Sequence, residues 1–407
     1  MFDVADSQML FRVRITVMQD GERVPLVIDR YGLPVPLPNQ WSLFIRRPRV
    51  QQNTLHEELR TVAHIYDWAT RRGLNLDERL LTGNGLSPAD LTALYQNLRY
   101  VRAIGRKSAS QRLTDAADIK VVSGKTHAVR VGYAREFLLW GLESALYHLD
   151  VSDRRVPEIR ERIGRIRRIA INFQRPSSDG SLKRIGLARE NRARLLEIAN
   201  PAFRKNPFHR TVRFRNWVIF VLLMTFGFRR GETLKIYVTD VNLNGRDPSI
   251  TIFRRTGDPL DTRANEPAVK TLGRKVPLSP EMVRILNTFI MNHRPQFPGA
   301  DGSPFLFFSE SGNPMALRSL NAMFQSVTRR FPEFEGILSP HVLRYTCNDM
   351  LTESAVALGI DPEMLTQIRN YLNGWSITSN QGALYSRRAI EERAAEISLA
   401  HQRSLFA

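Results

Sequence analysis

The last quarter of the sequence gathers side-chain types that act on phosphate esters. His341 and Arg344 are three residues apart in SPHVLRYT, so a helix would place both on one face. Trp375 follows in the segment NGW and Tyr385 in the segment LYSRR. On such a face the arginine would bind a phosphate, the histidine would transfer a proton, and the tyrosine would supply a nucleophilic oxygen. Because a neutral phenol is a poor nucleophile, this chemistry also needs further cations and a proton acceptor around the phosphate.

Two further cations occur upstream in segments that suit this task. Arg229 follows a very apolar stretch in TFGFRRGETLKI, and its planar guanidinium matches two oxygens of a phosphate. Glu232, one turn later, can hold this arginine, and the spacing favours Arg229 over Arg230. Lys270, in AVKTLGRKVPLS, would lie near a hairpin tip, from which it could protonate a leaving oxygen. Each residue alone also fits a purely structural role, as an exposed helix end, a surface lysine or a core tryptophan.

The elements that would position these residues lie in a predicted domain over residues 186–407. Helical periodicity marks a buried apolar helix at 217–226, then PEMVRILNTFIMNH, ALRSLNAMFQSVTRRF and the stretch after His341. The segments VTDVNLNG, PSITIFRR and AVKTLGRKVPLS predict three short strands. Ser339 as N-cap and Pro340 in the first turn place His341 at the positive end of a helix, which favours anion binding. The predicted fold class is mainly α with a small antiparallel β-sheet.

Two regions precede this domain. Residues 1–50 are expected to be β-rich, because MLFRVRITV and RVPLVI flank an Asp-Gly turn signal, and the Pro-rich YGLPVPLPNQW predicts an irregular stretch. This segment would cap the next domain or contact DNA as an arm, and we favour the cap. Residues 51–175 are expected to form an all-α domain, in which Ser87 and Pro88 open one of the helices.

Basic residues recur in the connecting segments of this first part. Lys107 between two serines, together with Arg102, Arg106 and Arg112, suits phosphate contact, although a solvated loop fits equally well. The Ser/Gly/Pro-rich QRPSSDGSLKR lies in an arginine-dense region and predicts a linker at 176–185. A basic linker can follow a DNA backbone, and the alternative is simple solvation.

The composition limits the class of partner. The chain has 407 residues, of which 43% are hydrophobic and 24% charged, but its formal net charge is +19. Such an excess of cations indicates nucleic acid first and an anionic membrane second, and no polybasic amphipathic helix favours the membrane. The single cysteine, Cys347, excludes an internal disulfide and a cysteine-rich zinc site and favours the cytoplasm. No signal peptide is recognisable, and the most apolar run, residues 217–228, is too short to span a bilayer.

The order of these residues and the sequences that flank them resemble the tyrosine recombinase (phage integrase) family of site-specific DNA recombinases. The resemblance covers residues 185–390 and includes LLMTFGFRRGETLKIYVTDVNL, KTLGRKVPLS, FLFFSESGNPM and SPHVLRYT. The helical region at 51–175 resembles the core-binding (SAM-like) domain of the same family. The sequence departs from the family pattern in the polar insertion FRRTGDPLDTRANEPAV and in a longer stretch between His341 and Trp375.

The resemblance implies how the scissile phosphate would be held. Arg229 and Arg344 would bind its non-bridging oxygens, and Glu232 would support the first of these arginines. Trp375 would occupy the family's His-or-Trp position and pack against the nucleophile.

It also implies how protons and bonds would move. Tyr385 would attack phosphorus and form a 3′-phosphotyrosyl link, His341 would take part in proton transfer, and Lys270 would protonate the departing 5′ oxygen. The link conserves the phosphodiester's energy, so neither ATP nor a metal is needed and no cofactor is expected.

The resemblance further implies the partners and the setting. The partner would be double-stranded DNA, bound by a homotetramer on two duplexes, with accessory DNA-bending or directionality proteins and no membrane. The C-terminal helix expected at 389–406 would dock on a neighbouring protomer or pack on its own domain. The protein would act in the cytoplasm on the DNA of a bacterium, phage or mobile element. A type IB topoisomerase or hairpin-end resolvase, with the same chemistry, and a catalytically idle DNA-binding protein remain the alternatives.

Overall fold

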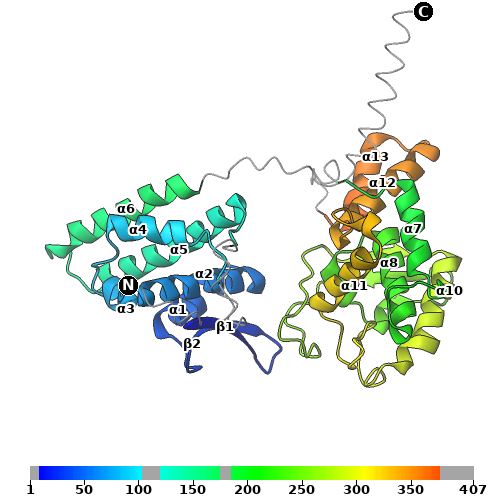
Figure 1. The fold of residues 1–407 in the computed structure, drawn as a ribbon, viewed down its shortest axis with the longest axis horizontal. Helices are drawn as coiled ribbons and strands as arrows, with labels where there is room; N and C mark the ends of the chain where they lie inside the picture. The colour runs from blue at the N-terminus through cyan, green and yellow to red at the C-terminus, as the bar shows by residue number, and fades with distance from the viewer. Residues whose placement is uncertain (1–8, 103–119, 175–184, 376–407) are drawn as a thin grey trace, which may run out of the picture. The chain divides into compact units, whose positions relative to one another are not determined.

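The computed structural model describes residues 9–102, 120–174 and 185–375, which fall into two compact units (Figure 1). The first unit is formed mainly by residues up to 181 and the second mainly by residues from 182 onward. Both are mostly helical, with one small antiparallel sheet in each, so the predicted fold class is confirmed for the described residues. In these residues no helix is both long enough and apolar enough to cross a membrane.

A β-hairpin opens the first unit and packs on the helix Gln52–Arg71. The elements are β1 (Phe11–Val17), β2 (Arg23–Asp29), α1 (Pro36–Gln40), the π-helical turn η1 (Trp41–Arg46), α2 (Gln52–Arg71), α3 (Leu76–Leu81), α4 (Pro88–Asn97), α5 (Gly124–Leu146) and α6 (Arg155–Phe173). The hairpin is antiparallel, and both of its strands contact α2. Gly21 has φ +87° at the predicted Asp-Gly turn, a conformation that glycine adopts without steric cost.

The expectation of an irregular stretch after this hairpin is wrong, because the Pro-rich segment folds into α1 and η1. Pro36 lies in the first turn of α1, where a missing backbone N–H breaks no helical hydrogen bond. The buried Asn39 fixes the helix to β2, since its amide both donates to the carbonyl of Val27, at 2.9 Å, and accepts from the N–H of Val27, at 2.8 Å.

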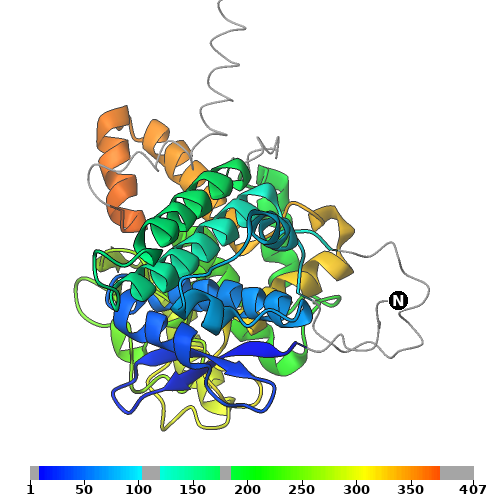
Figure 2. The same ribbon diagram turned by 90° about the vertical axis from the view of Figure 1, so that its left-hand side faces the viewer.

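Helix α4 of the first unit begins as its sequence predicts. Ser87 caps α4 by accepting a hydrogen bond from the N–H of Asp90, and Pro88 is the first residue of that helix. Helices α5 and α6 pack side by side, as Figure 2 shows.

Arg102 is not available for phosphate contact, because its guanidinium forms an ion pair with Asp67 inside the unit. Residues 106, 107 and 112 lie outside the described residues.

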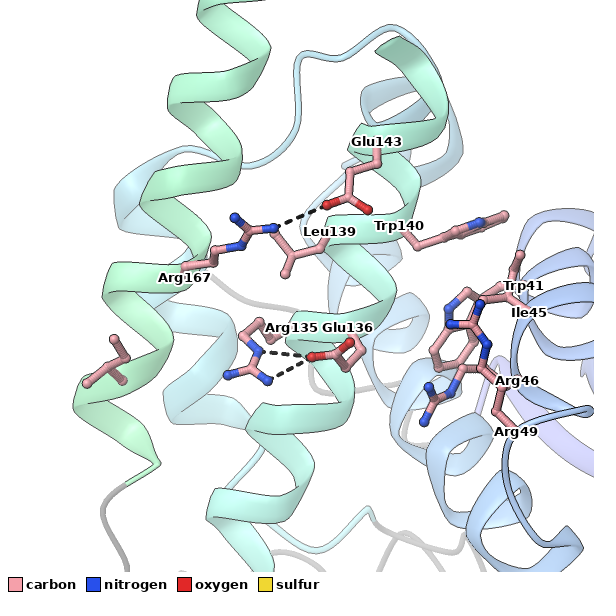
Figure 3. A pocket seen from close by; sticks show the side chains of 11 residues that line it. Trp41, Ile45, Arg46, Arg49, Arg135, Glu136, Leu139, Trp140, Glu143 and Arg167 are labelled. Carbon is pink, nitrogen blue, oxygen red and sulfur yellow. Dashed lines mark hydrogen bonds and ion pairs between the residues drawn. The ribbon is translucent and has the colours of Figure 1, made fainter. Parts of the chain in front are cut away.

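A cavity of about 460 Å³ opens beside η1, α5 and α6 in the first unit (Figure 3). Trp41 and Trp140 line it together with several arginines and glutamates. The guanidinium of Arg167 pairs with Glu143 at 3.3 Å. Arg135 pairs in the same way with Glu136 at 2.7 Å, so both glutamates that line the cavity have partners within the unit.

Helix α8 is the centre of the second unit. The elements are α7 (Arg189–Ala199), η3 (Arg210–Val212), α8 (Arg213–Phe226), α9 (Arg230–Leu234), η4 (Val238–Asp240), β3 (Val241–Asn242), β4 (Ser249–Ile252), β5 (Arg274–Pro277), α10 (Pro280–Thr288), η5 (Phe289–His293), η6 (Arg294–Gln296), α11 (Leu317–Arg330), η7 (Pro332–Phe334), α12 (Pro340–Ala357) and α13 (Pro362–Asn373). Val218, Phe220 and Leu222 of α8 are fully buried, and the helix packs against α7 and α12. The predicted buried helix is therefore confirmed.

The three predicted strands form one antiparallel sheet in the order β3-β4-β5. Ile250 of β4 pairs with Val241 on one side and with Val276 on the other. The connection from β4 to β5, residues 253–273, contains no regular secondary structure. It holds the polar insertion noted in the sequence, and it leads directly into the candidate site.

Candidate active site

Helix α9 presents the first candidate arginine at its N-terminus. Arg229 is the N-cap residue, and its backbone N–H donates to the Glu232 carboxylate at 2.8 Å. The Arg229 side chain is 30% exposed, whereas that of Glu232 is fully buried. Arg230 turns elsewhere and donates to Asn321 at 2.9 Å. The geometry therefore agrees with the spacing argument that selects Arg229 over its neighbour.

Helix α12 carries the second candidate arginine. Ser339 caps it by accepting from the N–H of Val342, so the helix begins as the Ser-Pro pair predicts. His341 is exposed in the first turn, and its ring lies edge-on to Tyr345 with centroids 5.1 Å apart. Arg344, one turn later, is only 1% exposed and donates to the carbonyl of Gly227. The histidine thus faces solvent while the arginine lies in the interior.

The two arginines meet at one carbonyl oxygen. Arg344 donates to the carbonyl of Asn373 at 3.0 Å, and Arg229 approaches the same oxygen at 3.5 Å. Each guanidinium has five N–H donors, so both can serve a shared acceptor and still have donors for other oxygens. The two cations are therefore close enough to bind one anion together.

Gly227 allows this approach. It ends α8 in the left-handed conformation, with φ +60°, and a side chain here would come within 3.1 Å of the Cys347 sulfur. Cys347 itself is inert, because burial raises the pKa of its thiol to about 12 and a thiol at neutral pH is then protonated. The only cysteine of the chain is thus excluded as the nucleophile.

Trp375 follows the left-handed Gly374 at the end of α13 and completes the wall of the site. Its ring is buried, and the Arg344 guanidinium lies 5.1 Å from the ring centroid. At Gly374 a side chain would come within 2.9 Å of the Leu272 carbonyl. The N–H of Leu272 donates in turn to the carbonyl of Gly374 at 3.0 Å, so Trp375 is fixed to the segment that carries Lys270.

Glu232 does more than the sequence suggested, because it binds three neighbours. Its main partner is Arg274 on β5, with nitrogen–oxygen distances of 3.2 and 3.0 Å. Thr271 also donates its hydroxyl to this carboxylate, whereas the Arg229 guanidinium lies 3.8 Å away. Burial opposes ionisation of Glu232, but Arg274 together with Arg344 and Thr271 outweighs this effect and lowers the pKa of the carboxyl below its usual value. The carboxylate is therefore charged and links α9 to β5.

Lys270 lies in the loop before β5 rather than at a hairpin tip. Its side chain is exposed, while its neighbours Val269 and Thr271 are buried. The structure thus brings Arg229, Glu232, Arg344 and Trp375 together and places the Lys270 segment against Glu232 and Gly374. His341 is one turn from Arg344, and Tyr385 lies outside the described residues.

Two further groups at the site were missed by the sequence reasoning. One is an amide pair that joins α12 to α13: Asn373 donates to the side-chain oxygen of Asn348 at 3.0 Å, and both residues are buried. Nothing in the sequence points to it, because the pair joins separate helices.

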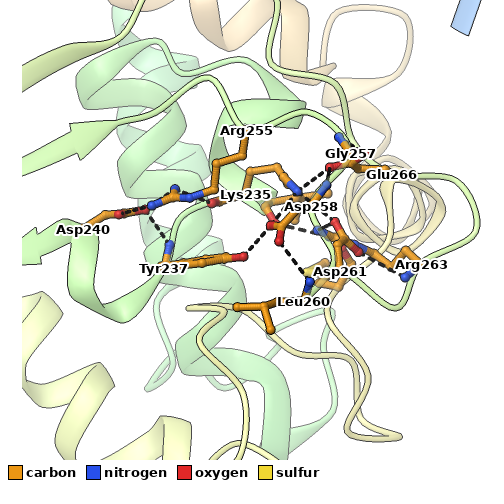
Figure 4. Close-up of polar contacts among 12 residues, drawn as sticks. Lys235, Tyr237, Asp240, Arg255, Gly257, Asp258, Leu260, Asp261, Arg263 and Glu266 are labelled. Carbon is orange, nitrogen blue, oxygen red and sulfur yellow. Dashed lines mark hydrogen bonds and ion pairs between the residues drawn. The ribbon is translucent and has the colours of Figure 1, made fainter. Parts of the chain in front are cut away.

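The other is a buried cluster around Lys235, which caps the C-terminus of α9 (Figure 4). Its ammonium donates to Asp258 at 3.0 Å, Asp261 at 3.1 Å and Glu266 at 2.6 Å. We refer to these four residues as the Lys235 cluster. A signal for it was available, since Lys235 stands between two buried apolar residues in LKI and a buried ammonium requires anionic partners.

Comparison with known proteins gives one family match and a set of similar structures. A family model described as the phage integrase family matches residues 187–371. No curated protein matches the sequence.

The solved structures that resemble this chain have low sequence identity to it. The Tn1549 transposon integrase in complex with a circular intermediate DNA is 18% identical, over 88% of this chain and 99% of that chain, with a TM-score of 0.50. The same integrase in complex with transposon right end DNA is 18% identical, over 89% and 100%, with a TM-score of 0.49. The XerH site-specific recombinase bound to a palindromic substrate is 15% identical, over 88% and 93%, with a TM-score of 0.44. The first of these likenesses shows a shared fold.

Proposed function

Residues 187–371 belong to the phage integrase family of tyrosine recombinases, and on that premise we propose that this protein cleaves and rejoins DNA at specific sites through a 3′-phosphotyrosyl intermediate. The observation that carries the proposal is the convergence of Arg229 and Arg344 on the carbonyl of Asn373. Two guanidinium groups at one point suit the two non-bridging oxygens of a phosphodiester.

The proposed cleavage step displaces a sugar oxygen. The Tyr385 oxygen bonds to phosphorus while the bond from phosphorus to the 5′ oxygen breaks. The phenol proton passes to a base, for which His341 is the candidate, and the 5′ oxygen receives a proton from Lys270. Arg229 and Arg344 stabilise the charge that develops on the non-bridging oxygens. Attack by a new 5′ hydroxyl reverses the step, so rejoining needs neither ATP nor a metal.

The partner in this proposal is double-stranded DNA. The net charge of +19 supports binding to a polyanion. The similar Tn1549 integrase structure contains DNA, which favours the same partner here. We propose further that four protomers act on two duplexes in the cytoplasm, with accessory DNA-bending or directionality proteins. The C-terminal helix expected at 389–406 lies outside the described residues.

The proposal is tested by covalent trapping on nicked DNA fragments. Cleavage near the nick releases a short strand, and its loss removes the 5′ hydroxyl that religation would need. The wild-type protein should remain attached to a small set of fragments, and sequencing these fragments would identify the site. The Tyr385→Phe variant should bind the same DNA with nearly unchanged affinity but form no covalent complex, because only the nucleophilic oxygen is removed.

Two controls separate this chemistry from other DNA-processing reactions. Chelation with EDTA should leave covalent trapping unchanged, and loss of trapping would indicate a metal mechanism. Covalent complexes that persist in Tyr385→Phe would exclude this tyrosine as the nucleophile. Binding without any covalent complex in the wild-type protein would favour a catalytically idle DNA-binding protein.

A further inference from the structure

The connection between β4 and β5 is held in place by ion pairs rather than by backbone hydrogen bonds of a strand or helix. Its three carboxylates in the Lys235 cluster come from positions 258, 261 and 266, while Lys235 belongs to the end of α9. The lysine is 1% exposed, and Asp261 is fully buried. Burying so many charges is favourable only when they are paired, so the cluster fixes the course of this loop relative to α9.

The loop is further fixed by groups around the cluster. Arg263 pairs with Asp261 at 2.7 Å and donates to the carbonyl of Met315 at 2.6 Å. The N–H of Gly257 donates to Glu266 at 3.1 Å, and the hydroxyl of Tyr237 donates to Asp258 (Figure 4). Both ends of the insertion are therefore bound to the Lys235 cluster.

The same loop carries Lys270, and both sides of that residue are attached to α9. Glu266, four residues earlier, binds Lys235 at the C-terminus of the helix. Thr271, the next residue, binds Glu232 in the first turn of the helix. Between them the backbone of Ala268 packs so closely on Gly231 that a side chain at Gly231 would lie 2.1 Å from the Ala268 carbonyl oxygen.

Arg229 is the N-cap of this same short helix. Helix α9 thus carries the phosphate-binding arginine at one end and, through Lys235, positions the loop of the candidate proton donor from the other. A displacement of the loop would move Lys270 relative to Arg229, and misplacement by about 1 Å can lower a reaction rate about 100-fold.

We propose that Lys235 is a positioning residue for Lys270. Lys235 does not touch the DNA, but it holds the Lys270 ammonium at the leaving 5′ oxygen. This inference rests on the proposed function, in which Lys270 is the proton donor. It assigns a task to the polar insertion: the insertion carries the carboxylates that attach the loop to α9.

The test replaces the leaving oxygen by sulfur. The substrate is a nicked duplex that contains the DNA site identified by covalent trapping. At its scissile phosphate, sulfur replaces the bridging 5′ oxygen, so the leaving group is a thiolate. A thiol has a pKa of about 8.5, far below that of an alcohol, so the thiolate leaves without a proton donor. The measured quantity is the rate of covalent complex formation by the full chain on the sulfur substrate divided by the rate on the matched oxygen substrate.

The expected results follow from this ratio. Lys270→Ala should slow capture of the oxygen substrate roughly 100-fold and restore it on the sulfur substrate, since general acid catalysis contributes at least this much. Lys235→Met should raise the ratio in the same direction, at least about 10-fold, because it disorders the position of the same proton donor. Glu266→Gln, which keeps the shape of the side chain, should give a smaller rise and serves if Lys235→Met fails to fold.

A matched control is Arg294→Met, which removes another buried cation of the second unit. Arg294 donates to the carbonyls of Ala300, Ser303 and Phe305, outside the β4–β5 connection. Its ratio should equal that of the wild-type protein, even if the variant is less stable.

The outcomes separate the inference from the function on which it rests. The positioning role alone would be overturned if Lys235→Met and Glu266→Gln slowed covalent complex formation equally on both substrates while the sulfur substrate still rescued Lys270→Ala. If Lys270→Ala slowed covalent complex formation equally on the oxygen and sulfur substrates, both the role of Lys270 as proton donor and the role of Lys235 as its positioning residue would be overturned. No covalent complex from the wild-type protein on either substrate would overturn the proposed function itself.

Discussion

Two ion-pair clusters of this protein both join cationic to anionic side chains, but their surroundings are very different. Around the cavity of Figure 3, Arg167 and Glu143 are 59% and 52% exposed, and Arg135 and Glu136 are 30% and 46% exposed. In the Lys235 cluster of Figure 4, no side chain is more than 7% exposed. Exposed pairs gain little because water screens them, whereas a buried charge that loses its partner is strongly destabilising. Only the second cluster can therefore hold a loop in one position.

The largest effect should follow removal of the buried ammonium. Lys235→Met leaves three carboxylates close together with one cation fewer, so we expect a loss of about 3–5 kcal/mol of folding free energy. Denaturant unfolding of the full chain measures the loss, and hydrogen exchange should rise first in residues 253–273. Unchanged exchange in this loop would show that the cluster does not hold it.

The pH dependence should separate the two units. In the first unit, burial foremost, and then the nearby Arg102 and Arg130, lower the pKa of His64 from 6.5 to about 3. The unfolded chain then binds a proton that the folded one does not, so stability present at neutral pH is lost as the pH falls below about 6.5. Between pH 7 and 5 this loss amounts to about 2 kcal/mol and should disappear in His64→Gln.

Two carboxylates of the Lys235 cluster, those of Asp258 and Asp261, respond at lower pH. Burial would raise the pKa of Asp258 and of Asp261, but hydrogen bonds to the two carboxylates outweigh this effect. At Asp258 the most important is the hydrogen bond from Tyr237, and at Asp261 it is the hydrogen bond from Arg263. Both pKa values lie below 3.8. Their contribution is present above about pH 4 and is lost only as the pH falls further. Protection from hydrogen exchange, measured relative to the unfolded chain at the same pH, should therefore fall between pH 7 and pH 5 in α2 and not in residues 253–273. The reverse result would contradict these assignments.

The smallest effect is expected at the cavity of Figure 3. Arg167→Ala breaks an exposed pair and should change the folding free energy by no more than about 0.5 kcal/mol. The measurement is the same denaturant unfolding, with Lys235→Met as the contrasting variant. A loss as large as that of Lys235→Met would mean that exposure does not set the difference between the clusters.

The comparison also explains what the sequence could predict. Helix α8, the Ser87 cap and the strands of the second sheet depend on residues near one another in the chain, and their patterns are local. The convergence of Arg229 and Arg344 was expected only through a family resemblance, because the two residues are distant in sequence. The Lys235 cluster was missed because its carboxylates lie in a polar insertion that looks solvated.

Local rules also failed in particular places. The prolines after β2 predict an irregular stretch, but Pro36 is in the first turn of a helix, where proline is tolerated. Arg102 was considered for phosphate contact because it is basic and lies near other basic residues, but it pairs with Asp67. Charge in a sequence does not reveal whether the partner is internal.

The central claim is that a tyrosine of this chain becomes linked to DNA, and the most direct measurement identifies that residue. The wild-type protein is trapped on its nicked site, digested with nuclease and protease, and the nucleotide-bearing peptide is sequenced by mass spectrometry. The account predicts one peptide, from the segment NQGALYSRR, with a 3′-phosphate attached to Tyr385. A nucleotide on any other residue, or DNA cleavage without a linked peptide, would contradict it.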